Sequence, residues 1–187
     1  MSTNGFVTPA ILGMGKYLPD TVMTNRDFEK MVDTSDEWIV SHTGIRERRI
    51  AREDETTSTQ GANAIRAAVE DAGMELTDLD LIIFTTSTPD PLGYPSSACL
   101  AQKHLGLAGR KHFCGAFDVF AACSGFCYGV NMAAQFIRTG MYRNIAIVGA
   151  ETNNKILNFT DRNTCILFGD GAGAVVMGPS KGSREYV

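Results

Sequence analysis

The 187-residue sequence has one tryptophan, three histidines and no uninterrupted apolar run long enough to cross a membrane. Residues 1–20 also lack the basic start and apolar core of a secretory signal, so we expect neither secretion nor membrane insertion. A net charge of −4 gives no support for nucleic-acid binding. The length and a composition of 44% hydrophobic and 20% charged residues suit one ordinary globular domain.

The cysteines follow neither a disulfide pattern nor a metal pattern. The sequence has five cysteines, which is an odd number, and they are spread over apolar segments. This distribution is typical of proteins in the reducing cytoplasm. We therefore expect a cytoplasmic protein. Cys123 and Cys127 stand four residues apart, but no Cys-x-x-Cys pair or nearby histidine joins them, so we expect no metal site.

Apolar runs of strand length alternate with segments of helical periodicity, which predicts an α/β layered fold with a mostly parallel mixed sheet. The predicted strands lie in 6–18, 81–86, 116–120, 144–149, 165–168 and 172–177. The predicted helices cover 26–32, a stretch from about residue 35, 57–73, 96–105 and 124–138. The 124–138 helix is apolar nearly all round, which indicates a central position.

The stretch from residue 115 to 130 organises the rest of the chain. It predicts a buried strand, a tight turn of small residues and a buried helix, with Cys123 at the corner. Unpaired N–H groups and the dipole at the start of that helix favour a thiolate, the nucleophilic form of cysteine. A structural, buried cysteine is the alternative interpretation, and this pattern alone does not choose between the two.

Three further features each allow a structural and a functional interpretation. Trp38 either packs in the core or offers a flat face to a ligand ring. The run 169–173 lacks the G-x-G-x-x-G spacing and leads into a strand, which predicts a close backbone approach rather than a dinucleotide loop. A basic cluster forms either a solvated face or a phosphate-binding patch, and its members are Arg46, Arg48, Arg49 and Arg52.

Three segments go beyond the level of fold class. Residues 33–48 (DTSDEWIV…TGIRER), 116–126 (AFDV…AACSGF) and 160–174 (TDR…FGDGAGA) closely resemble the β-ketoacyl-acyl-carrier-protein synthase III family. These are thiolase-fold condensing enzymes that initiate fatty-acid chains. The resemblance spans nearly all of residues 10–178 and implies the N-terminal half of that fold. It implies a half domain over residues 1–178, which carries the nucleophile, and a connector over 179–187 that leads to a second half.

The resemblance also implies roles for individual residues. Cys123 matches the cysteine that accepts the acyl group, and its own N–H is expected to stabilise the oxyanion. Trp38 and Arg162 match the pair that holds the adenine of coenzyme A, and Thr34 falls on a position near the nucleotide. The acyl pocket is expected to involve Phe168, Asn153 and Tyr94, the last of these from a dimer partner.

Two positions depart from the family pattern. His42 stands where some members carry an arginine near coenzyme A, which leaves that contact open. Asn153 lies in the stretch that lines the acyl pocket, so the preferred acyl chain does not follow from the sequence. The family's catalytic histidine and asparagine belong to the second half, and none of His42, His104 and His112 stands in a matching motif.

The implied activity is acyl transfer. An acyl-CoA, expected to be acetyl-CoA, acylates Cys123, and decarboxylative Claisen condensation with malonyl-acyl carrier protein then gives a 3-oxoacyl-acyl carrier protein, CO2 and coenzyme A. No permanent cofactor is expected, because the coenzyme A thioester is a substrate. The implied partners are a second half, without which helix 124–138 would expose an apolar face, and a second copy paired through the strand Ala116–Phe120.

Two other functions stay open. One is another thiolase-fold starter synthase, of polyketide type or a hydroxymethylglutaryl-CoA synthase, and the Trp38 segment argues against the latter. The other is a non-catalytic half subunit with a binding or scaffolding role, which has no need of an accessible thiolate at Cys123. Cys127 is the control cysteine, because four residues further along it is expected to face the helix packing.

Overall fold

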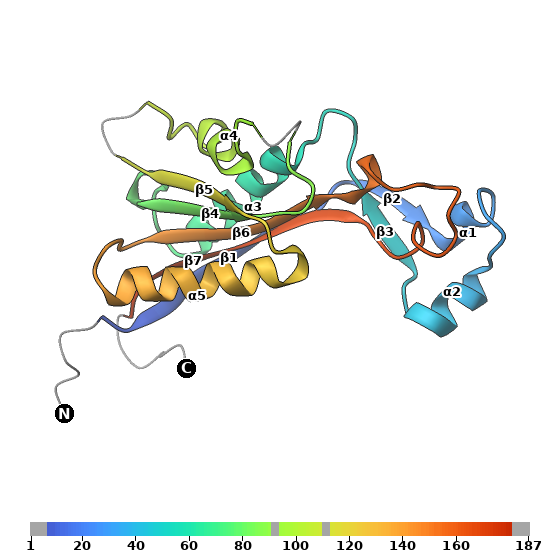
Figure 1. Ribbon diagram of the computed structural model, residues 1–187, viewed down its shortest axis with the longest axis horizontal. Coiled ribbons are helices and arrows are strands. Elements are labelled where there is room, and N and C mark those ends of the chain that lie inside the picture. The colour runs from blue at the N-terminus through green and yellow to red at the C-terminus, as the bar shows by residue number, and fades with distance from the viewer. Residues whose placement is uncertain (1–6, 91–93, 110–112, 181–187) are drawn as a thin grey trace.

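The computed structural model describes residues 7–90, 94–109 and 113–180. A five-stranded sheet runs along most of the molecule in the order β1–β7–β6–β4–β5 (Figure 1). Its strands are β1 (Pro9–Tyr17), β4 (Leu81–Thr85), β5 (Gly115–Val119), β6 (Ile145–Thr152) and β7 (Asp170–Pro179).

The sheet is mixed. β4 is parallel to both β5 and β6, whereas β7 is antiparallel to both β6 and β1. The predicted α/β class and mixed sheet are confirmed, but the sheet is not mostly parallel. Its two parallel pairs lie on the β5 side, and both pairs that β7 forms are antiparallel. Because β4, β5 and β6 point the same way, their carboxyl ends share one end of the sheet, where binding residues of α/β proteins commonly lie.

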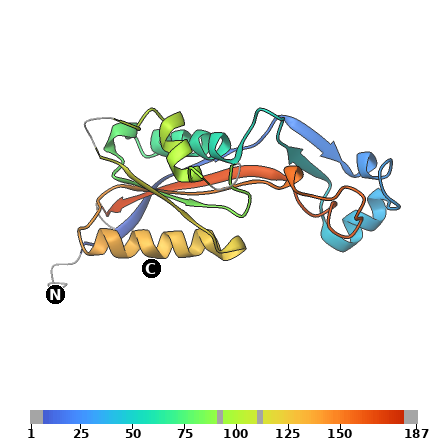
Figure 2. The same ribbon diagram turned by 45° about the horizontal axis from the view of Figure 1, so that its top comes forward.

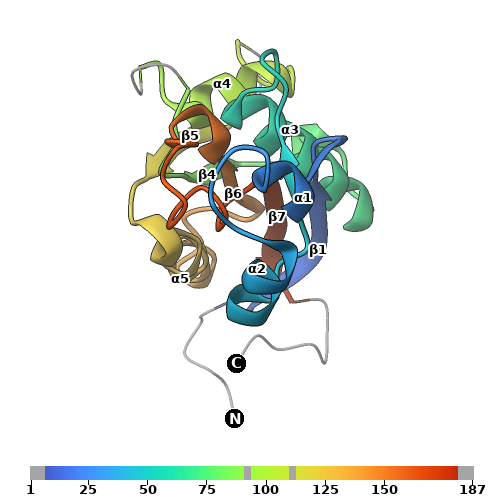
Figure 3. The same cartoon turned by 90° about the vertical axis from the view of Figure 1, so that its right-hand side faces the viewer.

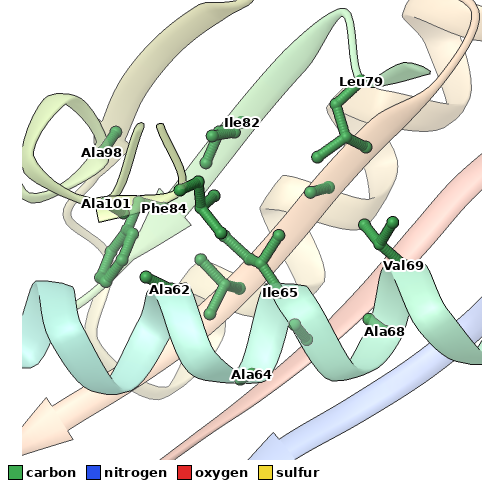
Figure 4. Close-up of a cluster of buried hydrophobic side chains, with 14 of the residues drawn as sticks. Ala62, Ala64, Ile65, Ala68, Val69, Leu79, Ile82, Phe84, Ala98 and Ala101 are labelled. Carbon is green, nitrogen blue, oxygen red and sulfur yellow. The ribbon is translucent and has the colours of Figure 1, made fainter. Parts of the chain in front are cut away.

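Helices cover both faces of the sheet (Figure 2). α3 (Thr57–Asp71) and α4 (Ser97–His104) lie on one face, and α5 (Gly125–Arg138) lies on the other. β4 shows the pattern, since Ile82 and Phe84 pack toward α3 while Leu81 and Ile83 pack toward α5. Figure 4 shows Ala62 and Ile65 of α3 on the side of the helix toward Phe84 and Ile82, with Ala64 and Ala68 on another side.

A smaller unit sits beyond the end of the sheet (Figures 1 and 3). It contains the antiparallel pair β2 (Thr21–Thr24) and β3 (Glu47–Ile50), with α1 (Asn25–Phe28) and α2 (Asp36–Thr43) between them. Its core unites residues far apart in sequence, since Phe28 and Ile39 pack with Cys165 and Ile166.

Several sequence predictions need correction. Residues 165–168 form turns rather than a strand. The apolar side chains of Cys165 and Ile166 pack in the core of the small unit and do not belong to the sheet. The pair β2 and β3 was not predicted, since its strands are short and separated by two helices. The basic cluster is not one patch. Arg48 is 4% exposed, and Arg52 pairs with the neighbouring acids Asp54 and Glu55.

The helix α5 is buried on one side only. Val130, Ala133 and Ile137 pack on the sheet, whereas Cys127 and Tyr128 are exposed on the outer side. The prediction that this half of the fold exposes an apolar helix face is therefore not confirmed as made, because the exposed side of α5 also carries Asn131, Gln135 and Arg138.

Among the described residues, no helix is long and apolar enough to cross a membrane. Within the same ranges, no group of three or more histidine, cysteine and acidic side chains is placed to hold a metal ion. The predicted connector falls almost wholly outside these ranges, because β7 reaches Pro179 and residues 181–187 are not described. His112 also lies outside them.

Candidate functional site

Cys123 lies in a short 3-10 helix, Ala122–Ser124, between the end of β5 and the start of α5. Its side chain is exposed, as the predicted corner position requires. The preceding residue, Ala122, has φ of +47°, a left-handed conformation that is uncommon for a residue with a side chain. This local reversal turns the chain from the edge strand into the helix and leaves the thiol on the surface.

Glycines bring the start of α5 against the sheet. A Cβ atom at Gly125 would lie 3.2 Å from Cβ of Thr85, and one at Gly129 would lie 2.9 Å from Cγ2 of Ile147. The helix therefore approaches the carboxyl end of β4 more closely than a larger residue allows. The 14-residue α5 begins two residues after Cys123, so the positive end of its dipole lies near that residue.

The five cysteines divide into an exposed and a buried group. Cys99, Cys123 and Cys127 are exposed, whereas Cys114 and Cys165 are buried. Burial raises the pKa of Cys114 to about 11 and also raises the pKa of Cys165, so both hold their protons firmly. The expectation that Cys127 faces helix packing is wrong, since its position on α5 points away from the sheet.

Trp38 forms the second part of the candidate site. The hydroxyl of Ser35 caps α2 by accepting the Trp38 N–H at 3.1 Å. The His42 ring stacks on the indole with centroids 4.2 Å apart and an interplanar angle of 20°. The guanidinium carbon of Arg162 lies 5.1 Å from the indole centroid, and an Arg162 nitrogen lies 3.7 Å from a carboxylate oxygen of Asp33.

Thr34 lies beside this aromatic group, at the start of α2. Its hydroxyl oxygen is buried and has no hydrogen-bond partner within the described part of the chain. It borders an open cavity of about 590 Å³ whose lining is largely polar: Arg26, Glu29, Thr34, Ser35, Asp36 and Glu37.

The turn segment from Asp161 to Phe168 supplies two of the predicted residues. The Asp161 carboxylate accepts the Asn163 N–H at 3.0 Å and the Thr164 hydroxyl at 2.7 Å, which closes the turn that carries Arg162. Phe168, at the other end, is 45% exposed. Gly169 follows Phe168, and its carbonyl oxygen accepts a hydrogen bond from the Asn153 side chain at 3.1 Å. Asn153 therefore lies close to the backbone next to Phe168.

The structure thus brings the predicted residues together in pairs. Trp38 meets Arg162 in one pair, and Asn153 lies beside the backbone next to Phe168 in the other. Tyr94 stands apart on the approach to α4. It is 88% exposed, which leaves it little contact with its own chain.

Sequence reasoning missed the groups that hold these elements in place. Asn25 is 1% exposed and joins α1 to α2, and Glu151 ties the end of β6 to the residues after β4. Their signal in the sequence is weak, because each is a polar residue whose partners are distant along the chain.

Comparison with known proteins shows which proteins the chain resembles. The sequence profile described as 3-oxoacyl-[acyl-carrier-protein (ACP)] synthase III matches residues 117–187. The beta-ketoacyl-[acyl-carrier-protein] synthase III of Caldanaerobacter subterraneus subsp. tengcongensis is 54% identical over 172 residues, which cover 92% of this chain and 50% of that protein. The Geobacillus kaustophilus protein of the same name is 54% identical over 174 residues, covering 93% of this chain and 54% of its own length.

Solved structures agree. The 3-oxoacyl-[acyl-carrier-protein] synthase III of Aquifex aeolicus matches with a TM-score of 0.86 and 47% identity, over 93% of this chain and 55% of that chain. The priming beta-ketosynthase of the R1128 polyketide pathway matches with a TM-score of 0.87 and 36% identity, over 97% of this chain and 53% of that one.

The chain spans about half the length of the curated relatives it matches. The predicted thiolase-like fold is confirmed by these structural matches. By sequence and by fold, the chain is similar to the N-terminal half of the β-ketoacyl-[acyl-carrier-protein] synthase III proteins.

Proposed function

We propose that this chain is the acyl-accepting half of a β-ketoacyl-acyl carrier protein synthase III and initiates fatty-acid synthesis. The observation that carries the proposal is the exposed thiol of Cys123 at the mouth of α5. Two of the other four cysteines are buried with raised pKa values. Of the three exposed cysteines, Cys99 and Cys127 lie within helices α4 and α5, whereas Cys123 lies at the corner that precedes α5.

The first step is transfer of the acyl group, with acetyl as the expected case. The Cys123 thiolate attacks the carbonyl carbon of an acyl-CoA, a new carbon–sulfur bond forms, and the coenzyme A thiolate leaves as the tetrahedral intermediate collapses. Charge collects on the carbonyl oxygen in that intermediate. The N–H of Cys123 and the unpaired N–H groups at the start of α5 are the groups that would stabilise it.

The nucleotide end of coenzyme A is assigned to Trp38 and Arg162. An indole face and a guanidinium 5.1 Å from it suit the ring and the charge of an adenine nucleotide. Thr34, with its unpaired buried hydroxyl, is assigned a polar contact there. Because coenzyme A enters as the thioester substrate, no permanently bound cofactor is required.

The second step, condensation with malonyl-acyl carrier protein, needs groups outside the described chain. Decarboxylation of the malonyl group releases CO2 and generates a carbanion, which attacks the carbonyl carbon of the Cys123 thioester. A carbon–carbon bond forms, the Cys123 thiolate leaves, and the 3-oxoacyl product remains on the carrier protein. The histidine and asparagine for this step are assigned to a second half of the fold, joined through residues 179–187 to the half domain 1–178. The exposed outer face of α5, with Tyr128 54% exposed, is the surface that such a half would cover.

A homodimer is the proposed assembly. β5 ends the sheet, so one edge of it has no partner strand among the described residues. An unpaired edge beside exposed aromatic side chains, Phe120 at 61% and Tyr94 at 88%, suits pairing with the same strand of a second copy. In that arrangement Tyr94 would reach the partner's acyl pocket, where Phe168 and Asn153 are the proposed lining residues.

A polyketide starter synthase is the second candidate, and one observation favours it. A priming ketosynthase has a TM-score of 0.87 with this chain. The two candidates differ in acyl substrate and carrier protein rather than in the role of Cys123.

Product formation tests the proposal. The protein as its gene encodes it is incubated with acetyl-CoA and malonyl-acyl carrier protein, beside a panel of longer acyl-CoAs. Acetoacetyl-acyl carrier protein formed by the natural protein but not by Cys123→Ala is the expected result. Equal product from both would refute the role of Cys123, product only from longer or branched starters would favour the second candidate, and no product from any starter would favour a scaffolding subunit.

A further inference from the structure

Arg48 is a buried arginine at the junction of the small unit. It lies on β3 and is 4% exposed. Its Nε donates to the carbonyl oxygen of Ile166 at 2.8 Å, and one terminal nitrogen donates to the same oxygen. The other terminal nitrogen donates to the side-chain oxygen of Asn25.

The charge of Arg48 is met only by neutral groups. The partners are a carbonyl and an amide oxygen, and the guanidinium carbon lies 4.8 Å from the centre of the Phe28 ring. No described carboxylate lies within ion-pair distance. Burying a cation this way is costly, and apolar residues commonly replace such groups without loss of stability. The arginine is therefore best explained by the geometry it imposes.

Asn25 extends that geometry to α2. Its side-chain nitrogen donates to the Asp36 carboxylate at 2.7 Å and to the Ile45 carbonyl at 2.8 Å, while its oxygen accepts from Arg48. Both ends of the amide are thereby fixed in one orientation. Asp36 is the first residue of α2, two positions before Trp38.

The same guanidinium holds the other side of the nucleotide site. Ile166 lies four residues after Arg162 and two before Phe168, in the turn segment. Gly169 lets this segment pass close to β3, because a Cβ there would lie 3.1 Å from Cβ of Arg48. One side chain thus links the helix that carries Trp38 with the turn that carries Arg162.

We propose that Arg48 is a positioning residue that sets the spacing between Trp38 and Arg162, and so governs affinity for the nucleotide end of the acyl-CoA. The proposal rests on the proposed function, since it assigns a role in the same site. Lysine cannot replace arginine here, because a single ammonium does not reproduce the planar set of three donors aimed at two fixed oxygens.

A comparison of two thioesters tests the role. Acetyl-CoA and acetyl-pantetheine carry the same reacting group, but only acetyl-CoA carries the nucleotide. For Arg48→Lys in the protein as its gene encodes it, we expect kcat/KM of Cys123 acylation to fall about tenfold with acetyl-CoA and to stay unchanged with acetyl-pantetheine. An equal fall with both thioesters, or no change with either, would overturn the proposal.

Two further variants sharpen the result. Arg49→Lys is the matched control. Arg49 is the next residue and is partly exposed, and it donates to the Pro19 carbonyl at 3.2 Å and pairs with Glu47 at 3.9 Å, so the change should leave both rates unchanged. If Arg48→Lys does not fold, Asp36→Ala decides, since it breaks the link from Asn25 to α2 and leaves the bonds of Arg48 intact. The same selective loss is expected, and an unaltered preference for acetyl-CoA would contradict the proposal.

The outcomes also separate this inference from the proposed function. A natural protein that reacts equally with the two thioesters, or in which Cys123→Ala still becomes acylated, would refute the proposed function itself. A natural protein that prefers acetyl-CoA, with Arg48→Lys keeping the full preference, would refute only the role of Arg48.

Discussion

The guanidinium of Arg162 and the indole of Trp38 face each other across 5.1 Å, although the two residues are more than a hundred positions apart in sequence. The His42 ring already stacks on the same indole at 4.2 Å. An adenine ring entering this site would exchange one stacking partner for another, so the site is prepared for a flat ligand.

The first prediction concerns that ring. Replacing Trp38 with alanine should weaken coenzyme A binding by about 1–3 kcal/mol, because stacking of a base on an aromatic side chain has that magnitude. Trp38→Phe should retain most of the affinity, since it keeps an aromatic face. Isothermal titration calorimetry with coenzyme A measures the difference, and an alanine variant with natural affinity would show that the nucleotide binds elsewhere.

The second prediction concerns the thiols. Brief treatment with iodoacetamide near neutral pH should label Cys99, Cys123 and Cys127, and leave Cys114 and Cys165 unlabelled until the protein unfolds. The reason is that the thiolate is the reacting form, and burial both shields these two thiols and raises their pKa values.

Peptide mass spectrometry after timed quenching reads the labelling order. Slow labelling of Cys127 would show that its face of α5 is covered in the protein as its gene encodes it, as expected for a second half. Rapid labelling of Cys114 would contradict the described packing.

The third prediction concerns Glu151. One of its carboxylate oxygens accepts the Ser87 N–H at 2.7 Å, and the other accepts the hydroxyls of Thr86 and Thr88. Each hydroxyl in turn accepts a backbone N–H, from Thr88 at 3.0 Å and from Thr152 at 2.9 Å. The Thr86 and Thr88 hydroxyls therefore donate their hydrogens to Glu151, and the network requires a side chain at this position that only accepts hydrogen bonds.

Glu151→Gln should accordingly destabilise the fold by about 1–3 kcal/mol despite its equal size, because its NH2 group would face either the Ser87 N–H or the two hydroxyl hydrogens, which are all donors. Denaturation in urea measures the change in the free energy of unfolding. Glu70→Gln, on the outer side of α3, is the control and should have almost no effect. An equal result for both variants would mean that the carboxylate is not required.

The fourth prediction concerns Gln60 in α3. Its side chain is 0% exposed, and neither its nitrogen nor its oxygen has a hydrogen-bond partner within the described ranges. Gln60→Met should stabilise the fold by about 1–3 kcal/mol, since it removes an unpaired polar group at similar volume. Gln102→Met should destabilise it, because Gln102 donates to the Cys114 carbonyl. A Gln60→Met variant less stable than the natural protein would point to a hydrogen-bond partner that the single chain lacks.

Local signals predicted much of the fold. The apolar runs at β4 and β6, the helix near residues 96–105 and the corner at Cys123 depend on neighbours in sequence, and they occur as expected. Residues 165–168 show the limit of such signals. An apolar run records burial but not conformation, and here the Asp161 turn prevents a strand.

The candidate site was harder to predict, because distant contacts decide it. In the sequence, Arg48 looks like one of several surface arginines. In the structure, its guanidinium binds the carbonyl oxygen of Ile166, which is 118 residues away. Cys127 reads as a packed helix residue because its neighbours are apolar, yet it occupies the outer side of α5. In both cases the periodicity is visible in the sequence, but the element that covers each face is not.

The most direct test of the account locates the acyl group. The protein as its gene encodes it is incubated with radiolabelled acetyl-CoA, digested, and its peptides are sequenced by mass spectrometry, alongside Cys123→Ala and Cys127→Ala. The account predicts acetyl on the Cys123 sulfur in the natural protein and in Cys127→Ala, and none in Cys123→Ala. Acetyl retained by Cys123→Ala, or found on another side chain of the natural protein, would contradict it.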